Sequence, residues 1–188
     1  KLQGFEVKQA EAERYLGMYF ISATYKETID YNLRKKHGVI QATASEIRNI
    51  CEMPLIKRYG KTAAQKLLIQ SQIVPQCLYG TQAYIMMEDE QYAALENSFK
   101  EAITTVMSVP KNTFYAALLK VNGLMYIEHF VDMVKLKMFN YKLNIKSSGR
   151  LVRVIREEIR TGRKGGLAED LSNLSKQSNI SATGSGLE

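Results

Sequence analysis

The pattern of apolar and polar residues changes about two dozen positions into the chain. Before that point, the segments LQGFEV (residues 2–7) and YLGMYFIS (residues 15–22) are short and rich in residues that suit strands. The polar stretch KQAEAER (residues 8–14) between them can turn the chain back. The pattern therefore predicts a β-hairpin within residues 1–24. Because two strands alone are marginally stable in water, this hairpin is expected to lie against other structure.

From Tyr25 onward, apolar residues recur mostly three, four or seven positions apart, as they do on one face of a helix. The first helix is predicted to run to about Met53, where Pro54 stops it. Its expected N-cap is Thr28 or Asp30, since both side chains can accept a hydrogen bond from the first turn.

A second helix is predicted to begin after Gly60 and to be kinked or divided at Pro75, because proline removes one backbone hydrogen bond. Its apolar residues lie almost all the way round the helix, which indicates a central, buried position. They are Leu67, Leu68, Ile69, Ile73, Val74 and Leu78.

Further helical patterns follow at intervals. One begins at residue 88 or 89 and ends by Pro110, a short one lies between Thr113 and a C-terminal signal at Asn122-Gly123, and another covers about 127–143. The predicted fold is therefore mainly α: a helical bundle of about five to six helices with an N-terminal β-hairpin. The bundle itself is assigned to residues 25–146.

Two segments come after the bundle. Residues 147–164 are predicted to form a basic C-terminal helix. Residues 165–188 are rich in Ser, Gly and Asn and cannot bury a core, so we expect a flexible tail. The last letters, SATGSGLE, are typical of vector-derived residues.

Composition narrows the class of protein. Of the 188 residues, 45% are hydrophobic and 24% are charged, which disfavours a disordered chain and a disulfide scaffold. No apolar run approaches about 18 residues, and the first residues lack a secretory signal, so no membrane association and no export are expected. Cys51 and Cys77 are predicted to be reduced thiols of an intracellular protein, cytoplasmic or nuclear.

Catalytic chemistry has little support in the sequence. There is no GxxxxGK[ST], GxSxG, HExxH or GxGxxG motif. The two histidines, His37 and His129, are expected to be solvated or hydrogen-bonded rather than metal ligands, and the cysteines have no paired spacing. We therefore expect no catalytic residue, metal site or cofactor.

Positive charge is concentrated in one part of the chain. The net charge is +7, and residues 111–166 carry 12 basic and 4 acidic side chains. Such an excess indicates a surface that faces a polyanion, the alternative being a merely solvated basic face. Contacts of this kind would bind the backbone of RNA, DNA or an RNA–DNA hybrid regardless of base sequence.

Three groups of basic residues are candidates for phosphate contacts. The C-terminal helix places arginines three or four positions apart along one face about 20 Å long, which suits a row of phosphates unless it is an ordinary solvated amphipathic helix. This group is Arg150, Arg153, Arg156, Arg160 and Arg163, with Lys164 beside it. The second group is Arg34, Lys35 and Lys36, and the third is Lys57, Arg58, Lys61 and Lys66.

Four segments, taken in order and with their spacing, resemble the region just after the palm in non-LTR (long interspersed element) retrotransposon reverse transcriptases. The chain departs from that family's pattern at Gln82, where Glu is usual, and at Tyr84, where Trp is usual. The four segments are YLGMYF (15–20), KLLIQSQIVPQCLYGTQAY (66–84), LENSFKEAITTVM (95–107) and LLKVNGLMYIEHFVDMVKLKMF (118–139).

The resemblance covers roughly residues 1–145 and implies a helical thumb. In that family a YLG strand closes the palm beside the primer grip, and the thumb lays a helix against the minor groove of the template–primer duplex. Mapped here, the helix from Gly60 to Tyr79 faces the duplex, and the basic residues around its start contact phosphates; these are Lys57, Arg58, Lys61 and Lys66. The catalytic aspartates of the palm would precede Lys1, so the chain is expected to be a fragment of an RNA-directed DNA polymerase and not an enzyme by itself.

The expected function is therefore that of a non-catalytic thumb fragment that clamps the template–primer duplex or template RNA, with the palm and fingers of the reverse transcriptase as partners. A row of arginines past the thumb is expected to bind template RNA. The alternative is a helical protein-interaction or self-association module that does not bind nucleic acid. The exposed edge of the hairpin is expected to favour self-association in either case.

Overall fold

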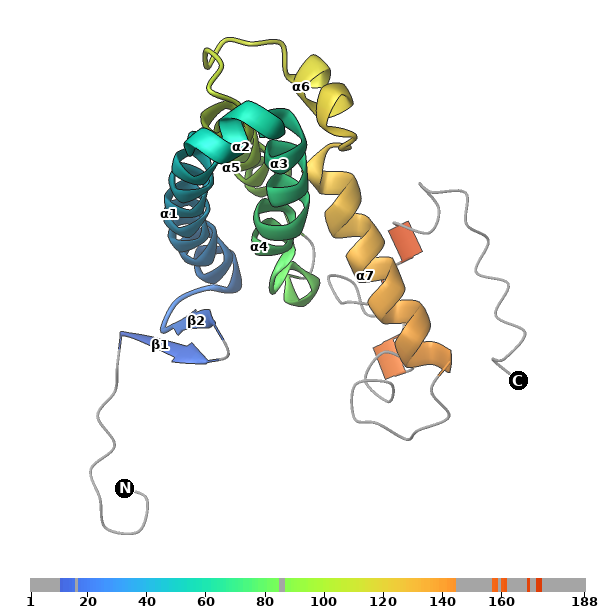
Figure 1. Ribbon diagram of the computed structural model, residues 1–188. Helices are drawn as coiled ribbons and strands as arrows, with labels where there is room; N and C mark the ends of the chain where they lie inside the picture. The colour runs from blue at the N-terminus through green and yellow to red at the C-terminus, as the bar shows by residue number, and fades with distance from the viewer. Residues whose placement is uncertain are drawn as a thin grey trace.

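Helices form most of the described chain, and a two-stranded hairpin precedes them (Figure 1). The computed structural model describes residues 11–15, 17–84, 87–144, 157–158, 160–161, 169 and 172–173. The predicted mainly α fold with an N-terminal β-hairpin is confirmed. Most of the predicted helix at 147–164 and of the tail at 165–188 lies outside the described residues.

The hairpin pairs β1 (Ala12–Tyr15) with β2 (Met18–Ile21) in antiparallel fashion. Its position differs from the prediction, because residues expected to turn the chain form β1 and the expected first strand lies outside the described residues. The chain reverses instead between Tyr15 and Met18, where Gly17 has φ +80°. Glycine adopts this left-handed conformation without a steric penalty, so the tight connection depends on it.

Helix α1 (Tyr25–Cys51) begins one turn earlier than its predicted cap. Thr24 is the N-cap: its side chain accepts a hydrogen bond from the Glu27 N–H, and the Glu27 carboxylate accepts one from the Thr24 N–H at 2.9 Å. This capping box satisfies two backbone donors that the helix leaves unpaired. The prediction of Thr28 or Asp30 was wrong, because Thr24 and Glu27 have the T-x-x-E spacing of a capping box and start the helix earlier.

After α1 the chain forms α2 (Pro54–Tyr59). Pro54, which was predicted to stop the first helix, is also the first residue of this second one. A continuous helical segment then runs through α3 (Lys61–Leu68), η1 (Ile69–Ile73) and α4 (Val74–Leu78). We call these three elements the rod. The predicted start after Gly60 is confirmed.

The kink or division predicted at Pro75 is not located at the proline, because α4 continues through Pro75; the irregularity in this helix is the π-helical segment η1, which ends two residues earlier. The Val74 N–H donates to the Ile69 carbonyl, a bond that spans five residues instead of four. The rod is not buried all round, since Leu67 is 65% exposed while Ile69 and Ile73 are fully buried.

The remaining elements are η2 (Thr81–Ala83), α5 (Asp89–Met107), α6 (Tyr115–Asn122) and α7 (Ile127–Asn144). The start of α5 and the end of α6, which closes at Gly123 with φ +65°, agree with the predictions. None of the described helices combines the length and the apolar character needed to cross a membrane.

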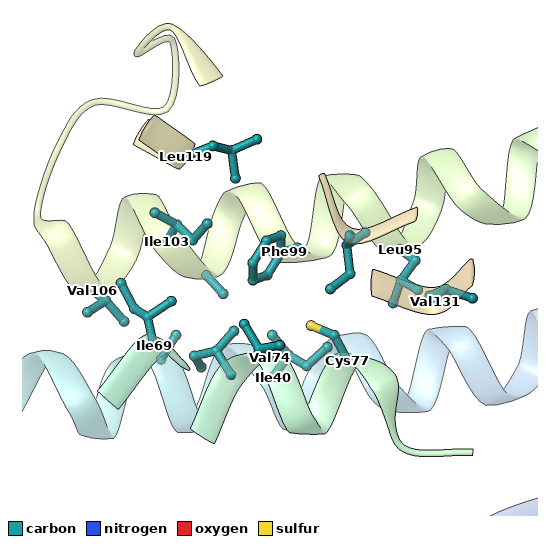
Figure 2. Packing of buried hydrophobic residues seen from close by; sticks show 14 of the residues in the cluster. Ile40, Ile69, Val74, Cys77, Leu95, Phe99, Ile103, Val106, Leu119 and Val131 are labelled. Atoms are coloured by element: carbon teal, nitrogen blue, oxygen red, sulfur yellow. The ribbon is translucent and has the colours of Figure 1, made fainter. Parts of the chain in front are cut away.

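The core lies where α1, the rod and α5 meet, and α7 packs on the end formed by α4 and η2. Figure 2 shows Phe99 of α5 pointing toward Ile40 of α1 and Cys77 of the rod, and all three side chains are fully buried. Both cysteines are free and buried, and burial raises the pKa of the Cys77 thiol to about 12. This packing joins α1 to both α5 and the rod.

Candidate nucleic-acid interface

The hairpin is fastened to α1 by the side chain of Asn32, which is 5% exposed. Its amide Nδ2 donates to the Tyr19 carbonyl at 2.7 Å, and its Oδ1 accepts from the Tyr19 N–H at 2.7 Å. A side-chain amide thus pairs with β2 in the way a neighbouring strand would. The outward backbone groups of Tyr19 are therefore satisfied, whereas β1 has no strand on its outer side among the described residues. Self-association through that edge stays a prediction.

Two glycines bring the hairpin against the end of the rod. A Cβ atom at Gly17 would lie 2.9 Å from Cε1 of Tyr79, and one at Gly80 would lie 3.1 Å from Sδ of Met18. Both glycines also have positive φ, at +80° and +76°. The YLG and YG motifs, far apart in the sequence, therefore pack on each other.

This docking leaves a hollow of about 520 Å³ between the hairpin, α1 and the end of the rod. We call it the hairpin hollow. The residues that determine its chemistry are cationic or aromatic: Arg14, Tyr19, Lys35, Lys36, Tyr79 and Tyr84. No carboxylate is found among the described residues that line it.

Two exposed cations of the hairpin hollow gather around one ring. Arg14 lies opposite Tyr19 across the strands, and its guanidinium carbon is 5.8 Å from the centre of the Tyr19 ring. The ammonium of Lys35 is 6.0 Å from the same ring and 5.4 Å from that of Tyr31. Within the described part of the chain, neither cation forms an ion pair with a carboxylate. Their charge therefore remains available to an anion.

Lys36 has a different role from the predicted surface contact. Its Nζ donates to the carbonyls of Cys77 at 2.9 Å and Tyr79 at 2.5 Å, and it lies 5.7 Å from the centre of the Tyr84 ring. Burial lowers the pKa of Lys36 to about 8. Its ammonium satisfies the last carbonyls of α4, as lysines near helix C-termini often do. Lys36 therefore adds positive charge beneath the hairpin hollow rather than a free hydrogen-bond donor.

The rod extends from the hairpin hollow toward the other end of α1. The π-helical segment exposes Gln70, Ser71 and Gln72, and no charged residue occurs between Lys66 and Tyr79. Amide and hydroxyl groups are both donors and acceptors. Segments of π-helix are often found at functional sites.

The third predicted basic group lies at the opposite end of α1 from the hairpin (Figure 1). There Glu52 accepts from Lys61 and pairs with Lys57 at 3.1 Å, and these bonds lower the pKa of the Glu52 carboxyl. Arg58 lies 5.2 Å from the centre of the exposed Tyr59 ring, and Lys66 is partly buried. Two of the four predicted cations are thus already paired with a carboxylate.

Arg34 does not belong to the same surface as Lys35. It lines a second hollow of about 690 Å³, between α1 and α5, which also includes Asp30, His37 and Glu101. We call this the α5-side hollow. Consecutive residues of a helix point in different directions, so the predicted single patch of Arg34, Lys35 and Lys36 was wrong.

Of the predicted arginine row, the structure describes Arg160. Arg160 is exposed and holds Glu157 with two hydrogen bonds, Nε to Oε2 at 3.1 Å and Nη2 to Oε1 at 2.6 Å. The rest of this group lies outside the described residues: Arg150, Arg153, Arg156, Arg163 and Lys164. Template RNA binding by this helix stays a prediction.

Ser98, His37 and Glu101 lie together in the α5-side hollow, in the order found in some catalytic arrays. Nδ1 of His37 is 2.9 Å from the Ser98 hydroxyl, and Nε2 is 3.8 Å from a Glu101 carboxylate oxygen. However, the Ser98 hydroxyl donates its proton to the Ala94 carbonyl at 2.8 Å. It can then only accept from His37, so this geometry does not activate a nucleophile. The described residues also contain no cluster of His, Cys, Asp and Glu suited to a metal ion.

Sequence reasoning missed Arg14, Tyr19 and Tyr79 as site residues. Arg14 fell in the expected turn, and the correct register, with Gly17 as the turning residue, would have placed it opposite Tyr19. Comparison with protein-family models, curated proteins and solved structures gives no match to the chain.

Proposed function

We propose that this chain is a non-catalytic nucleic-acid-binding unit: a thumb fragment of a retroelement reverse transcriptase that clamps a template–primer duplex or template RNA through phosphate contacts. The observation that carries the proposal is the hairpin hollow, where Arg14 and Lys35 have no carboxylate partner among the described residues. Like charges gathered in this way repel each other, and an anion that binds between them relieves the repulsion.

Basic residues lie at the two ends of the rod, which suits a long, regularly charged ligand. Lys36 and Glu52 mark the two ends of the rod along α1, and the helical rise places them about 24 Å apart. That distance corresponds to roughly seven base pairs of a duplex. Between the ends, the exposed Ser71 hydroxyl and Gln72 amide of the π-helical segment offer uncharged groups to a groove, whereas the Gln70 amide donates to the Asn122 carbonyl at 3.0 Å. In this arrangement the ends contact phosphates and the middle of the rod contacts sugars or base edges.

Fluorescence anisotropy with labelled RNA–DNA hybrid, duplex DNA and single-stranded RNA, each at two salt concentrations, tests the proposal. Lys35→Glu reverses a charge in the hairpin hollow, and Arg34→Glu is the matched control because both side chains are exposed and adjacent in sequence. We expect Lys35→Glu to weaken binding by about tenfold, and Arg34→Glu by less than about twofold. Equal effects of the two substitutions would contradict the proposal.

The alternative function, a protein-interaction module, has one observation in its favour. Helix α2 buries none of its residues, and Leu55 and Tyr59 are 74% and 73% exposed. Sedimentation equilibrium distinguishes the two functions. Self-association that Leu55→Ser abolishes, together with no salt-dependent binding of any nucleic acid, would favour the alternative.

A further inference from the structure

We propose that the hairpin hollow holds one unpaired nucleotide of a nucleic-acid strand, with its phosphate between Arg14 and Lys35 and its base or ribose against Tyr79. The inference rests on the proposed function, and it adds a substrate class to that site: a single-stranded unit beside the duplex.

The volume of the hairpin hollow suits a single nucleotide. Small-molecule sites in proteins usually have volumes of about 300–1,000 Å³, and the hairpin hollow, at about 520 Å³, lies in that range. A duplex is far too wide to enter a space of this volume. An unpaired nucleotide can be turned out of its strand and inserted, as proteins that bind single strands commonly require.

The residues of the hollow match the two parts of a nucleotide. The guanidinium carbon of Arg14 and the ammonium of Lys35 lie 5.8 and 6.0 Å from the centre of the Tyr19 ring, so both cations border the same part of the hollow and can turn toward one phosphate there. Tyr79 is 56% exposed, yet the Gly17 backbone packs against its ring, which fixes the plane. A fixed and exposed ring is a stacking surface for any base.

The arrangement also explains why Gly17 and Gly80 are needed. A side chain on Gly17 would displace the Tyr79 ring, and one on Gly80 would displace Met18. Either movement would change the separation between the cations on the hairpin side and the ring on the rod side. The hollow therefore depends on the docking of the two motifs.

The test compares a blunt RNA–DNA hybrid with the same hybrid carrying one unpaired nucleotide, using the full chain in anisotropy titrations. For the wild type we expect the overhang to increase affinity by about tenfold. Tyr79→Ala and Lys35→Gln should remove this gain. Tyr15→Ala is the matched control, since Tyr15 is an exposed tyrosine of the same hairpin that does not line the hollow, and it should keep the gain.

A second measurement covers the case in which Tyr79→Ala undocks the hairpin. A 5-iodouridine placed at the overhang and irradiated should cross-link the wild-type chain at the peptide that contains Tyr79. A cross-link to another peptide, or a gain that survives both substitutions, would overturn the inference. If the blunt hybrid binds and the overhang adds nothing, the single-nucleotide site is wrong while the proposed function stands; if neither ligand binds, the proposed function itself is wrong.

Discussion

Helix α1 separates two hollows whose lining residues differ in charge. The α5-side hollow, about 690 Å³, has acids and bases together: Asp30, Glu90 and Glu101 with Arg34 and His37. The hairpin hollow, about 520 Å³, has cations and tyrosines and no carboxylate among its described lining residues. The helix thus places Arg34 on the side where acidic and basic residues occur together, which we call the balanced side. It places Lys35 and Lys36 on the side where no described carboxylate lines the hollow, which we call the unbalanced side.

The balanced side belongs to the packing of α1 on α5. Gln91 donates to Asp30 at 2.8 Å, His37 and Lys111 lie 3.8 and 3.7 Å from Glu101, and the buried core continues directly beneath them. On the other side, the hairpin is docked through the Asn32 side chain and through the close approaches at Gly17 and Gly80. The comparison teaches that stability resides mainly on the first side and the available charge on the second.

The largest expected effect comes from the core on the α5 side. Phe99 is fully buried between α5 and α1, and Phe99→Ala should lower the free energy of unfolding by about 3–5 kcal/mol because it leaves a cavity. Phe114→Ala is the control, since Phe114 is 75% exposed and its loss should cost little. Urea denaturation measures both. Similar losses for the two variants would refute the assignment of the core.

A smaller and local effect is expected on the hairpin side. Gly17→Ala places a Cβ against Tyr79 and forces a left-handed backbone, which costs about 1–2 kcal/mol before the contact is counted. Hydrogen exchange should accelerate at β2 while α1 and α5 keep their protection. Gly38→Ala, a helical site with nothing within 4 Å, should instead stabilise the chain by about 0.5–1 kcal/mol. Uniform loss of protection would show that the hairpin is not a separate, weakly docked element.

The buried ammonium of Lys36 predicts a pH dependence. Its pKa is lowered from 10.5 to about 8 by burial, so between these values the unfolded chain binds one more proton than the folded chain. Lys36 should therefore contribute a rise in stability with pH in this window, about 1 kcal/mol from pH 8 to 9. The Cys77 thiol, whose pKa is raised from 9.0 to about 12, acts in the opposite direction, because in the unfolded chain it already begins to ionise between pH 8 and 9; it offsets about a third of the Lys36 contribution.

The control for this prediction is Lys36→Met, which removes the titrating group. Urea denaturation at pH 8.0, 8.5 and 9.0 should show the rise in the wild type and its absence in the variant. A rise of equal size in both chains would show that Lys36 is not its source.

The smallest effect is expected for the exposed ion pairs of the α5-side hollow. Glu101→Gln removes the partner of His37 and Lys111, but the pairs lie in solvent and should contribute less than about 0.5 kcal/mol. Thermal denaturation at low and high salt should differ little between this variant and the wild type. A loss comparable to that of Phe99→Ala would mean that charge balance, not packing, holds α1 to α5.

Local signals predicted much of the fold. Gly60, Glu88 and the Asn122-Gly123 pair mark helix ends through their own backbone chemistry. The register of the hairpin was mispredicted because β1 is polar and short, and its partner is set by the Gly17 turn.

The candidate site was harder to predict because it is tertiary. The hairpin hollow exists only once Gly17 meets Tyr79, which no local pattern indicates. Likewise, Lys36 is as basic in sequence as Lys35, but the end of α4 covers it and takes its hydrogen bonds. Sequence reasoning selected the stretch of α1 that borders both hollows but did not distinguish its sides.

The most direct test of the account is the salt dependence of binding to an RNA–DNA hybrid. The slope of log affinity against log salt should be steep for the wild type, and the double variant Arg14→Gln/Lys35→Gln should lower it by about 1.8, since each lost phosphate contact removes about 0.9. Arg34→Gln, on the other side of α1, should leave it unchanged. A slope that is the same in all three chains would contradict the claim that the hairpin side of α1 binds a phosphate backbone.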